Sequence, residues 1–279
     1  PSDGAGSGTV VDQQRPSRSP PPASPMATPT LPPAIETRGL SLRFGGATIV
    51  EDVSFSVPTG LFVSIIGPNG AGKTSLFNLL SGLYSPSAGS VWLRGDDITG
   101  MPPFARVRQG LGRSFQLTTV FAGLSTLENT RLAAQASHPG NYAFWRGAAH
   151  NRAARERAAW ALETVGLAGK ERVVAGSLSH GDKRKLDLAI LLCSEPDVLL
   201  LDEPTAGVSA EEVPVMLDVI RRIRQVEGKT VLMVEHKMDV VHDLSDRVAV
   251  LANGALVAYD TPAAVMADPF VRSAYLGVT

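Results

Sequence analysis

The chain has 279 residues, of which 26 are Lys or Arg and 27 are Asp or Glu, so its formal net charge is −1 at pH 7. This length is enough for one large domain or two small ones with a sizeable core. The near balance of charge gives no sign of a nucleic-acid partner, and the single cysteine, Cys193, excludes an internal disulfide framework and a zinc site built from several cysteines.

Neither a membrane-spanning segment nor a secretory signal is visible in the sequence. No run approaches the ~18 consecutive apolar residues that a membrane helix needs. The first residues lack a positively charged start followed by an apolar core. We therefore expect a cytoplasmic protein.

Residues 1–33 are dominated by Pro, Ser, Gly, Ala and Thr. Such a composition buries too little apolar surface to offset the entropy lost on ordering, so we expect a disordered tail there. Residues 34–279 are expected to form the folded domain.

Three β-like segments open this domain, at residues 36–44, 49–57 and 61–66. The third leads into Gly67-Pro68-Asn69-Gly70-Ala71-Gly72-Lys73-Thr74, which matches the phosphate-binding loop pattern G-x-x-x-x-G-K-[ST]. A helix-compatible run follows at residues 75–80. A strand before the loop and a helix after it are the context that this motif requires.

The residue types of the loop suit a polyphosphate. Glycines let backbone N–H groups converge on the phosphates, and the following helix adds the positive end of its dipole. Lys73 is expected to reach the β and γ phosphates, and the Thr74 hydroxyl to ligate Mg²⁺. The predicted nucleotide-binding residues of the loop are Gly67, Pro68, Asn69, Gly70, Ala71, Gly72, Lys73, Thr74 and Ser75.

The later elements predict an α/β fold. After a strand at 89–94, the stretch 117–195 is mostly helical, with helices at 126–136 and 149–165. The elements beyond it are a strand at 198–202, a helix at 210–226, a strand at 230–234, a helix at 237–244 and strands at 247–251 and 255–259. Strands that alternate with helices imply a largely parallel sheet, with sites at the carboxyl ends of its strands.

Further motifs narrow the class of nucleotide-binding protein. Leu178-Ser179-His180-Gly181-Asp182 precedes a basic run, Asp202 and Glu203 end an apolar strand, and His236 follows the strand at 230–234. Asp202 suits Mg²⁺, and Glu203, one residue further, can polarise the attacking water. His236 carries both a donor and an acceptor, which suits a bridge between the γ-phosphate and the backbone.

These motifs resemble, in order, the signature, the Walker B strand with its catalytic glutamate, and the switch histidine of ABC-type ATPases. Gln116 matches the glutamine loop of that family, and Phe44 matches the aromatic residue that stacks on adenine. The resemblance implies a P-loop NTPase of ABC type, with a mixed or parallel sheet core, an antiparallel β subdomain and an inserted α-helical subdomain at about residues 117–195. It also implies hydrolysis of ATP with Mg²⁺, in which Gln116 contacts the metal and the water.

In the ABC family, the signature completes the site of another subunit. The resemblance therefore implies that Ser179 and Gly181 contact the γ-phosphate held by a second ATPase subunit in a head-to-tail dimer. The sequence departs from the family pattern twice: the signature reads LSHGD rather than LSGGQ, and Ser209 stands where many relatives have an aspartate. These departures bear on communication across the dimer rather than on ATP binding.

Within the family, the chain is similar to the ATP-binding subunits of branched-chain (hydrophobic) amino acid importers, of the longer subunit type. The segments that carry this similarity are 113–116, 178–181, 206–207, 234–239 and the ending 274–277. The similarity implies two integral-membrane permeases, an extracytoplasmic solute-binding protein, and attachment to the inner face of the plasma membrane. We expect the permease contact on residues 117–129 and the neighbouring insertion 133–152.

Several alternatives stay open. Urea or amide importers and the lipopolysaccharide-export ATPase share much of the pattern. A soluble ABC ATPase acting in complex assembly, as in iron–sulfur cluster assembly, is an alternative of a different class. An ABC ATPase of translation or repair would carry two cassettes, long coiled coils or zinc inserts, none of which the sequence contains.

Overall fold

The computed structural model describes residues 32–114, 120–136, 147–225, 228–269 and 271, and for residues 147–151 the backbone alone. Residues 1–31 of the predicted tail, Gln116 and the ending 274–277 lie outside the described residues. So do residues 117–119 and 137–146 of the predicted permease surface.

A four-stranded antiparallel sheet forms the first layer. Its order is β2-β1-β4-β5, and each neighbouring pair in it runs antiparallel. The strands are β1 (Ile35–Phe44), β2 (Ala47–Val57), β4 (Ala88–Leu93) and β5 (Asp96–Asp97). The strands predicted at 36–44, 49–57 and 89–94 are confirmed here, as is the antiparallel β subdomain expected from the resemblance.

The central sheet has six strands in the order β10-β9-β3-β8-β7-β6. All its neighbours run parallel except β9 and β10, so the largely parallel sheet is confirmed for the described residues. Its strands are β3 (Phe62–Ile66), β6 (Leu111–Arg113), β7 (Val198–Asp202), β8 (Thr230–Val234), β9 (Arg247–Ala252) and β10 (Ala255–Asp260). The carboxyl ends of β3, β7 and β8 therefore meet at one edge, where the loop, the carboxylates and His236 follow.

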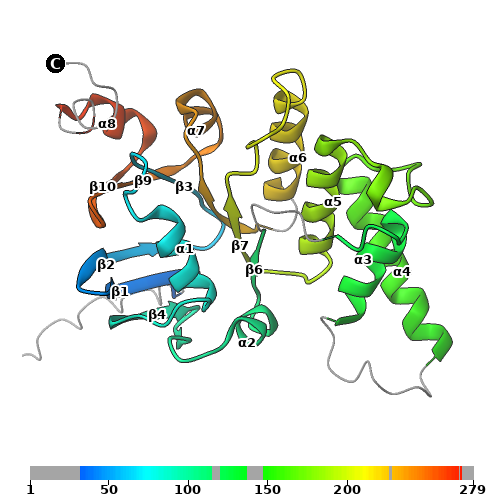
Figure 1. Cartoon of the computed structure of the whole chain (residues 1–279), viewed down its shortest axis with the longest axis horizontal. Coiled ribbons are helices and arrows are strands. Elements are labelled where there is room, and N and C mark those ends of the chain that lie inside the picture. The colour runs from blue at the N-terminus through cyan, green and yellow to red at the C-terminus, as the bar shows by residue number, and fades with distance from the viewer. Residues whose placement is uncertain (1–31, 115–119, 137–146, 226–227, 270, 272–279) are drawn as a thin grey trace, which may run out of the picture. The chain divides into compact units, whose positions relative to one another are not determined.

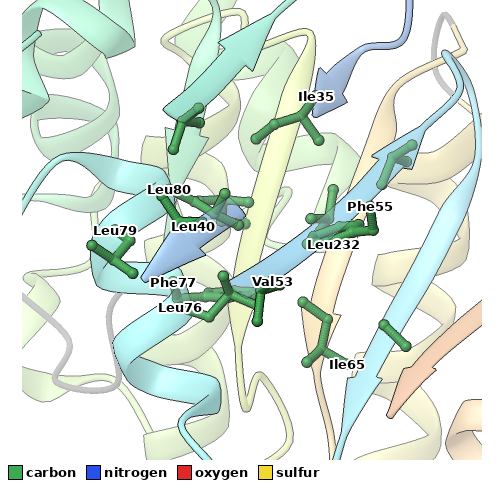
Figure 2. Packing of buried hydrophobic residues seen from close by; sticks show 14 of the residues in the cluster. Ile35, Leu40, Val53, Phe55, Ile65, Leu76, Phe77, Leu79, Leu80 and Leu232 are labelled. Atoms are coloured by element: carbon green, nitrogen blue, oxygen red, sulfur yellow. The ribbon is translucent and has the colours of Figure 1, made fainter. Parts of the chain in front are cut away.

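The two faces of the central sheet bury different hydrophobic clusters. Leu200 of β7 belongs to one cluster and its neighbour Leu201 to the other, as the alternation of side chains along a strand requires. The first cluster also contains side chains of β1, β2 and α1 (Lys73–Ser81), and Figure 2 shows them packing toward Ile65 and Leu232 of the central sheet. The helix that follows the phosphate-binding loop is thus held between two sheets.

Three helices contact one another and lie together at the right of the view in Figure 1. They are α3 (Thr126–Ala136), α4 (Gly147–Thr164) and α5 (His180–Leu192). The prediction of a helix at 126–136 is confirmed at both ends. This helical group carries the signature, because its helix α5 begins at His180, within residues 178–182.

The remaining helices are α2 (Pro103–Arg108), α6 (Val213–Gln225), α7 (Met238–Leu244) and α8 (Pro262–Ala267). Helix α6 buries Met216, Val219, Ile220 and Ile223, whose spacing places them on one helical face. It begins later than the predicted residue 210. None of the helices in the described part of the chain combines the length and the apolar character that a membrane crossing requires.

Candidate functional site

The phosphate-binding loop joins β3 to α1, as Figure 1 shows. Gly72, just before α1, has φ +95°, and a Cβ there would lie 2.7 Å from the carbonyl oxygen of Ile49. A Cβ on Gly67 would lie 2.2 Å from the carbonyl oxygen of Leu251, so the loop is packed tightly from behind. The first turn of α1 has no acidic residue and Gly72 supplies no side-chain cap, which keeps backbone N–H groups for an anion.

Lys73 lies inside this loop. Its ammonium donates hydrogen bonds to the carbonyl oxygens of Gly67, at 2.7 Å, and Pro68, at 2.9 Å. Burial lowers the pKa of Lys73, and the nearby carboxylates of Glu203 and Asp202 oppose that effect. The cation is therefore held against the loop at the cavity it lines, and its contact with phosphates stays a prediction.

A cavity of about 360 Å³ opens in front of the loop. It is lined by Ile49, Asn69, Gly70, Ala71, Gly72, Lys73, Thr74, Ser75, Glu203 and His236. The predicted loop residues 69–75 thus share one cavity with the predicted catalytic Glu203 and His236. Elements far apart in the sequence meet there because β3, β7 and β8 are neighbours in the central sheet.

Glu203 and His236 contact each other at the edge of this cavity. The Nε2 atom of His236 lies 2.9 Å from Oε1 of Glu203, and both side chains are partly exposed. Glu203 has φ +46°, a backbone conformation that costs energy for a residue with a side chain. Its N–H donates to the carbonyl oxygen of Val234, which holds the strained residue against β8.

Asp202 lies one residue earlier, at the end of β7, and its side chain is only 1% exposed. Its Oδ2 atom accepts a hydrogen bond from Nη2 of Arg113 at 3.0 Å, and its N–H donates to the Ser114 hydroxyl at 3.3 Å. The two adjacent carboxylates therefore have different surroundings: Asp202 is buried beside a cation, whereas Glu203 faces the cavity.

The signature residues stand apart from this cavity. The Ser179 hydroxyl caps the start of α5 by accepting a hydrogen bond from the Asp182 N–H at 3.1 Å. A Cβ on Gly181 would lie 2.7 Å from a carboxylate oxygen of Glu212, so this turn is closely packed. Among the described residues that line the cavity, neither Ser179 nor Gly181 is present.

Phe44 is not among the described residues that line the cavity. It is 51% exposed, and its ring contacts that of Tyr84 edge to face, with 5.3 Å between the ring centroids. The exposed ring leaves room for another group, and its stacking on adenine stays a prediction. Gln116, the remaining predicted site residue, is outside the described residues.

The sequence interpretation did not single out Glu235, a buried carboxylate next to His236. Its oxygens accept hydrogen bonds from the Thr205 hydroxyl at 3.0 Å and from the Lys237 N–H at 3.2 Å. Glu235 thereby ties the segment that carries His236 to the segment that follows Glu203. A charged residue directly after the apolar strand 230–234 was the signal that could have drawn attention to it.

Comparison with known proteins identifies the family. The model of the ABC transporter family matches residues 50–206, more than half of the chain. The chain belongs to the ABC transporter family. This ABC ATPase binds nucleotide and hydrolyses ATP, and the fold class predicted from its motifs is confirmed.

Relatives of this ABC ATPase are similar over nearly their whole length. The high-affinity branched-chain amino acid transport ATP-binding protein BraF of Pseudomonas aeruginosa is 37% identical over 250 residues, which are 88% of this chain and 98% of BraF. The corresponding LivG of Escherichia coli is 36% identical over the same share of both chains. The crystal structure of the ADP conformation of MJ1267, an ATP-binding cassette of an ABC transporter, has a TM-score of 0.76 and 28% identity, and covers 88% of this chain and 99% of MJ1267.

Proposed function

We propose that this chain is the ATP-hydrolysing subunit that energises an importer for branched-chain or other hydrophobic amino acids. The observation that carries the proposal is the similarity to BraF and LivG, which are branched-chain amino acid transport ATP-binding proteins and match over 98% of their length. A transporter ATPase needs integral-membrane permeases as partners, and an importer also needs an extracytoplasmic solute-binding protein.

The oxygen donors of the site fit Mg²⁺. The Thr74 hydroxyl lines the cavity and the Asp202 carboxylate lies near Lys73, and both are hard oxygen ligands of the kind that Mg²⁺ takes. No group of three or more His, Cys, Asp or Glu side chains in the described residues could hold a metal ion alone. Thr74 and Asp202 and, outside the described residues, Gln116 would hold the ion together with the nucleotide. When bound, it would neutralise charge on the β and γ phosphates.

Glu203 is proposed to polarise the attacking water. Its carboxylate faces the cavity that Lys73 also lines, and it has the strained backbone of a residue at positive φ. His236, in contact with Glu203, would contact the γ-phosphate and keep the carboxylate oriented. The loop N–H groups and Lys73 would stabilise the charge of the transferring phosphoryl group.

A second ATPase subunit is proposed to complete the site. Ser179 and Gly181 lie at the start of α5, whose N-terminal dipole favours an anion. In a head-to-tail dimer they would meet the γ-phosphate held by the other subunit's loop. ATP would then favour the closed dimer, and hydrolysis the open one, which is a population shift that a permease can use.

A surface beside α2 is proposed to receive the permease together with the surface predicted at residues 117–129 and 133–152, to which Ala136 belongs. A cavity of about 450 Å³ there is lined by residues that include Phe104, Val107, Arg108, Ala136 and Glu195. Phe104 is 63% exposed and Val107 is 38% exposed. Exposed apolar side chains bordered by charges suit an amphipathic cytoplasmic segment of a permease, which would hold the ATPase at the inner face of the plasma membrane.

The test is isolation of the tagged chain with its partners from detergent-treated membranes, followed by reconstitution of the complex in liposomes. We expect two multi-span permeases to accompany the chain, and ATP hydrolysis to rise with leucine-loaded solute-binding protein. Phe104→Asp should lose the permeases while still binding ATP, because it puts a charge into the apolar surface. Val257→Asp, at an exposed apolar residue of β10 that is not among those lining this cavity, is the control and should keep the permeases.

Other outcomes would contradict the proposal. Stimulation by urea but not by leucine would point to a urea importer. Permeases that carry lipopolysaccharide would point to the export ATPase, and soluble partners alone would favour the assembly role. Permeases that stay with Phe104→Asp would contradict the docking surface but not the transport function.

A further inference from the structure

A buried cation, Arg113, lies against the carboxylate proposed to hold Mg²⁺. The side chains of Arg113 and Asp202 are 7% and 1% exposed, and Nη2 of Arg113 lies 3.0 Å from Oδ2 of Asp202. Burying both charges is costly unless they are paired and hydrogen-bonded, as they are here. A buried ion pair near the phosphate-binding loop therefore calls for a functional explanation.

The strand order explains how Arg113 reaches Asp202. Arg113 ends β6, which is paired in parallel with β7, and it sits opposite Leu200 in that ladder. Its side chain can therefore extend along β7 to the carboxylate at the end of that strand. Ser114, the next residue, accepts a hydrogen bond from the Asp202 N–H.

The other side of the same guanidinium is anchored to α1. Nη1 of Arg113 donates to Oδ1 of Asn78 at 2.7 Å and to Oγ of Ser81 at 2.8 Å. The guanidinium carbon lies 5.8 Å from the centroid of the Phe77 ring. Arg113 thus links Asp202 to the helix whose first turn is proposed to hold the phosphates.

We propose that Arg113 is a positioning residue that fixes the Asp202 carboxylate in the orientation that Mg²⁺ bound to ATP requires. The inference rests on the proposed role of Asp202 as a Mg²⁺ ligand. Two separate nitrogens of the planar arginine fork hold a carboxylate on one side and two helix acceptors on the other, whereas the donors of lysine all share one nitrogen.

Two opposite effects of Arg113 on Mg²⁺ must be weighed. As a cation it competes with the metal for Asp202, so its removal would favour Mg²⁺. As an anchor it orients the carboxylate, so its removal would disfavour Mg²⁺, and the loss of an outer partner of a metal ligand typically lowers affinity by about 10–100-fold. The anchoring to Asn78 and Ser81 makes orientation the larger effect, because it holds the guanidinium in one place.

The experiment measures binding of a fluorescent ATP analogue in EDTA and during a Mg²⁺ titration, without hydrolysis. Arg113→Met should raise by about tenfold the Mg²⁺ concentration that gives half of the maximal change in binding of the ATP analogue. It should leave the affinity for the analogue in EDTA unchanged. Arg113→Lys should raise that Mg²⁺ concentration less, because it keeps the charge and loses the fork. Asn78→Ala, which removes only an anchor of Arg113, should shift it in the same direction by a smaller amount.

Arg106→Lys is the matched control. Arg106 is 1% exposed and donates to carbonyl oxygens that include those of Leu79 and Leu80, also in α1. Its replacement should lower the thermal unfolding temperature without changing the Mg²⁺ dependence.

The outcomes separate the inference from the proposed function. A lower Mg²⁺ requirement, or equal losses of affinity with and without Mg²⁺, in the Arg113 and Asn78 variants would overturn the positioning role. If Asp202→Asn alone changes the Mg²⁺ dependence and these variants match the wild type, the inference is wrong and the metal site stands. If Asp202→Asn changes nothing, the metal assignment fails and the inference fails with it.

Discussion

At the end of β7, two adjacent carboxylates have different surroundings and therefore suit different tasks. Asp202 is almost fully buried beside Arg113, so it remains in one orientation. Glu203, next to it, turns through a strained backbone to face the cavity and His236. A fixed oxygen suits a metal ligand, whereas a cavity-facing carboxylate suits proton transfer from water.

Glu203→Gln should therefore separate binding from hydrolysis. The amide keeps the size of the side chain but cannot accept the proton of the attacking water, so turnover should fall by at least about 100-fold while ATP affinity is unchanged. With hydrolysis blocked, ATP should trap the dimer, and size-exclusion chromatography should detect it.

The same variant tests the shared site. Ser179→Arg placed in the Glu203→Gln background should abolish the trapped dimer, because the longer cation blocks the start of α5. Normal turnover in Glu203→Gln would remove this residue from the role of base. A dimer that persists with Ser179→Arg would argue against the head-to-tail arrangement.

At the scale of elements, the short strand β6 matters because it carries Arg113 and Ser114 to the edge of the central sheet. It contains Gly112, where a Cβ would lie 2.6 Å from Cδ1 of Leu191 and 2.9 Å from Cβ of Pro196. The absence of a side chain at residue 112 thus allows β6 to lie close to the end of α5 and the segment that follows it.

Gly112→Ala should destabilise the fold. The Leu191 side chain can move, but the Pro196 ring is stiff, so the added methyl group should cost about 1–3 kcal/mol of the free energy of unfolding, as overpacking does. Urea unfolding measures this. Gly100→Ala, where a Cβ would meet no atom within 4 Å, is the control and should be neutral or slightly stabilising. Equal stability of both variants would contradict the close approach.

At the scale of the whole molecule, the central sheet joins two large hydrophobic clusters, so the fold around the site is stabilised from both faces. The second cluster includes the single cysteine, Cys193, which is fully buried at the end of α5. Burial raises the pKa of its thiol from 9.0 to about 12. The thiol is therefore a small apolar core group and not a nucleophile.

This burial predicts a dependence of stability on alkaline pH. Because the folded pKa lies above the unfolded one, the unfolded chain releases the proton from pH 9 upward while the folded chain keeps it, so stability falls as pH rises toward 12. Between about pH 8 and pH 10 the wild type should lose about 1 kcal/mol more than Cys193→Ala, by urea unfolding of both. Equal losses would mean that the thiol is not buried as described.

Much of the fold follows from patterns that are local in the chain. The strands at 198–202 and 230–234 and the helix at 126–136 are predicted at their observed bounds, since each is a short apolar run or a helix-favouring segment with clear ends. β6 was not predicted, because a three-residue segment with a glycine and an arginine has no strand pattern of its own. It is a strand because β7 offers it a partner.

The sequence by itself determined the family and the chemistry of the loop, because a phosphate-binding loop depends on glycines, a lysine and a hydroxyl at fixed spacing in one continuous segment. Only the tertiary structure decided that Phe44 rests against Tyr84, and that Glu235 bonds Thr205. It alone also decided that Arg113 holds Asp202. These contacts join residues far apart in the chain, and they exist because the order of the strands brings them together.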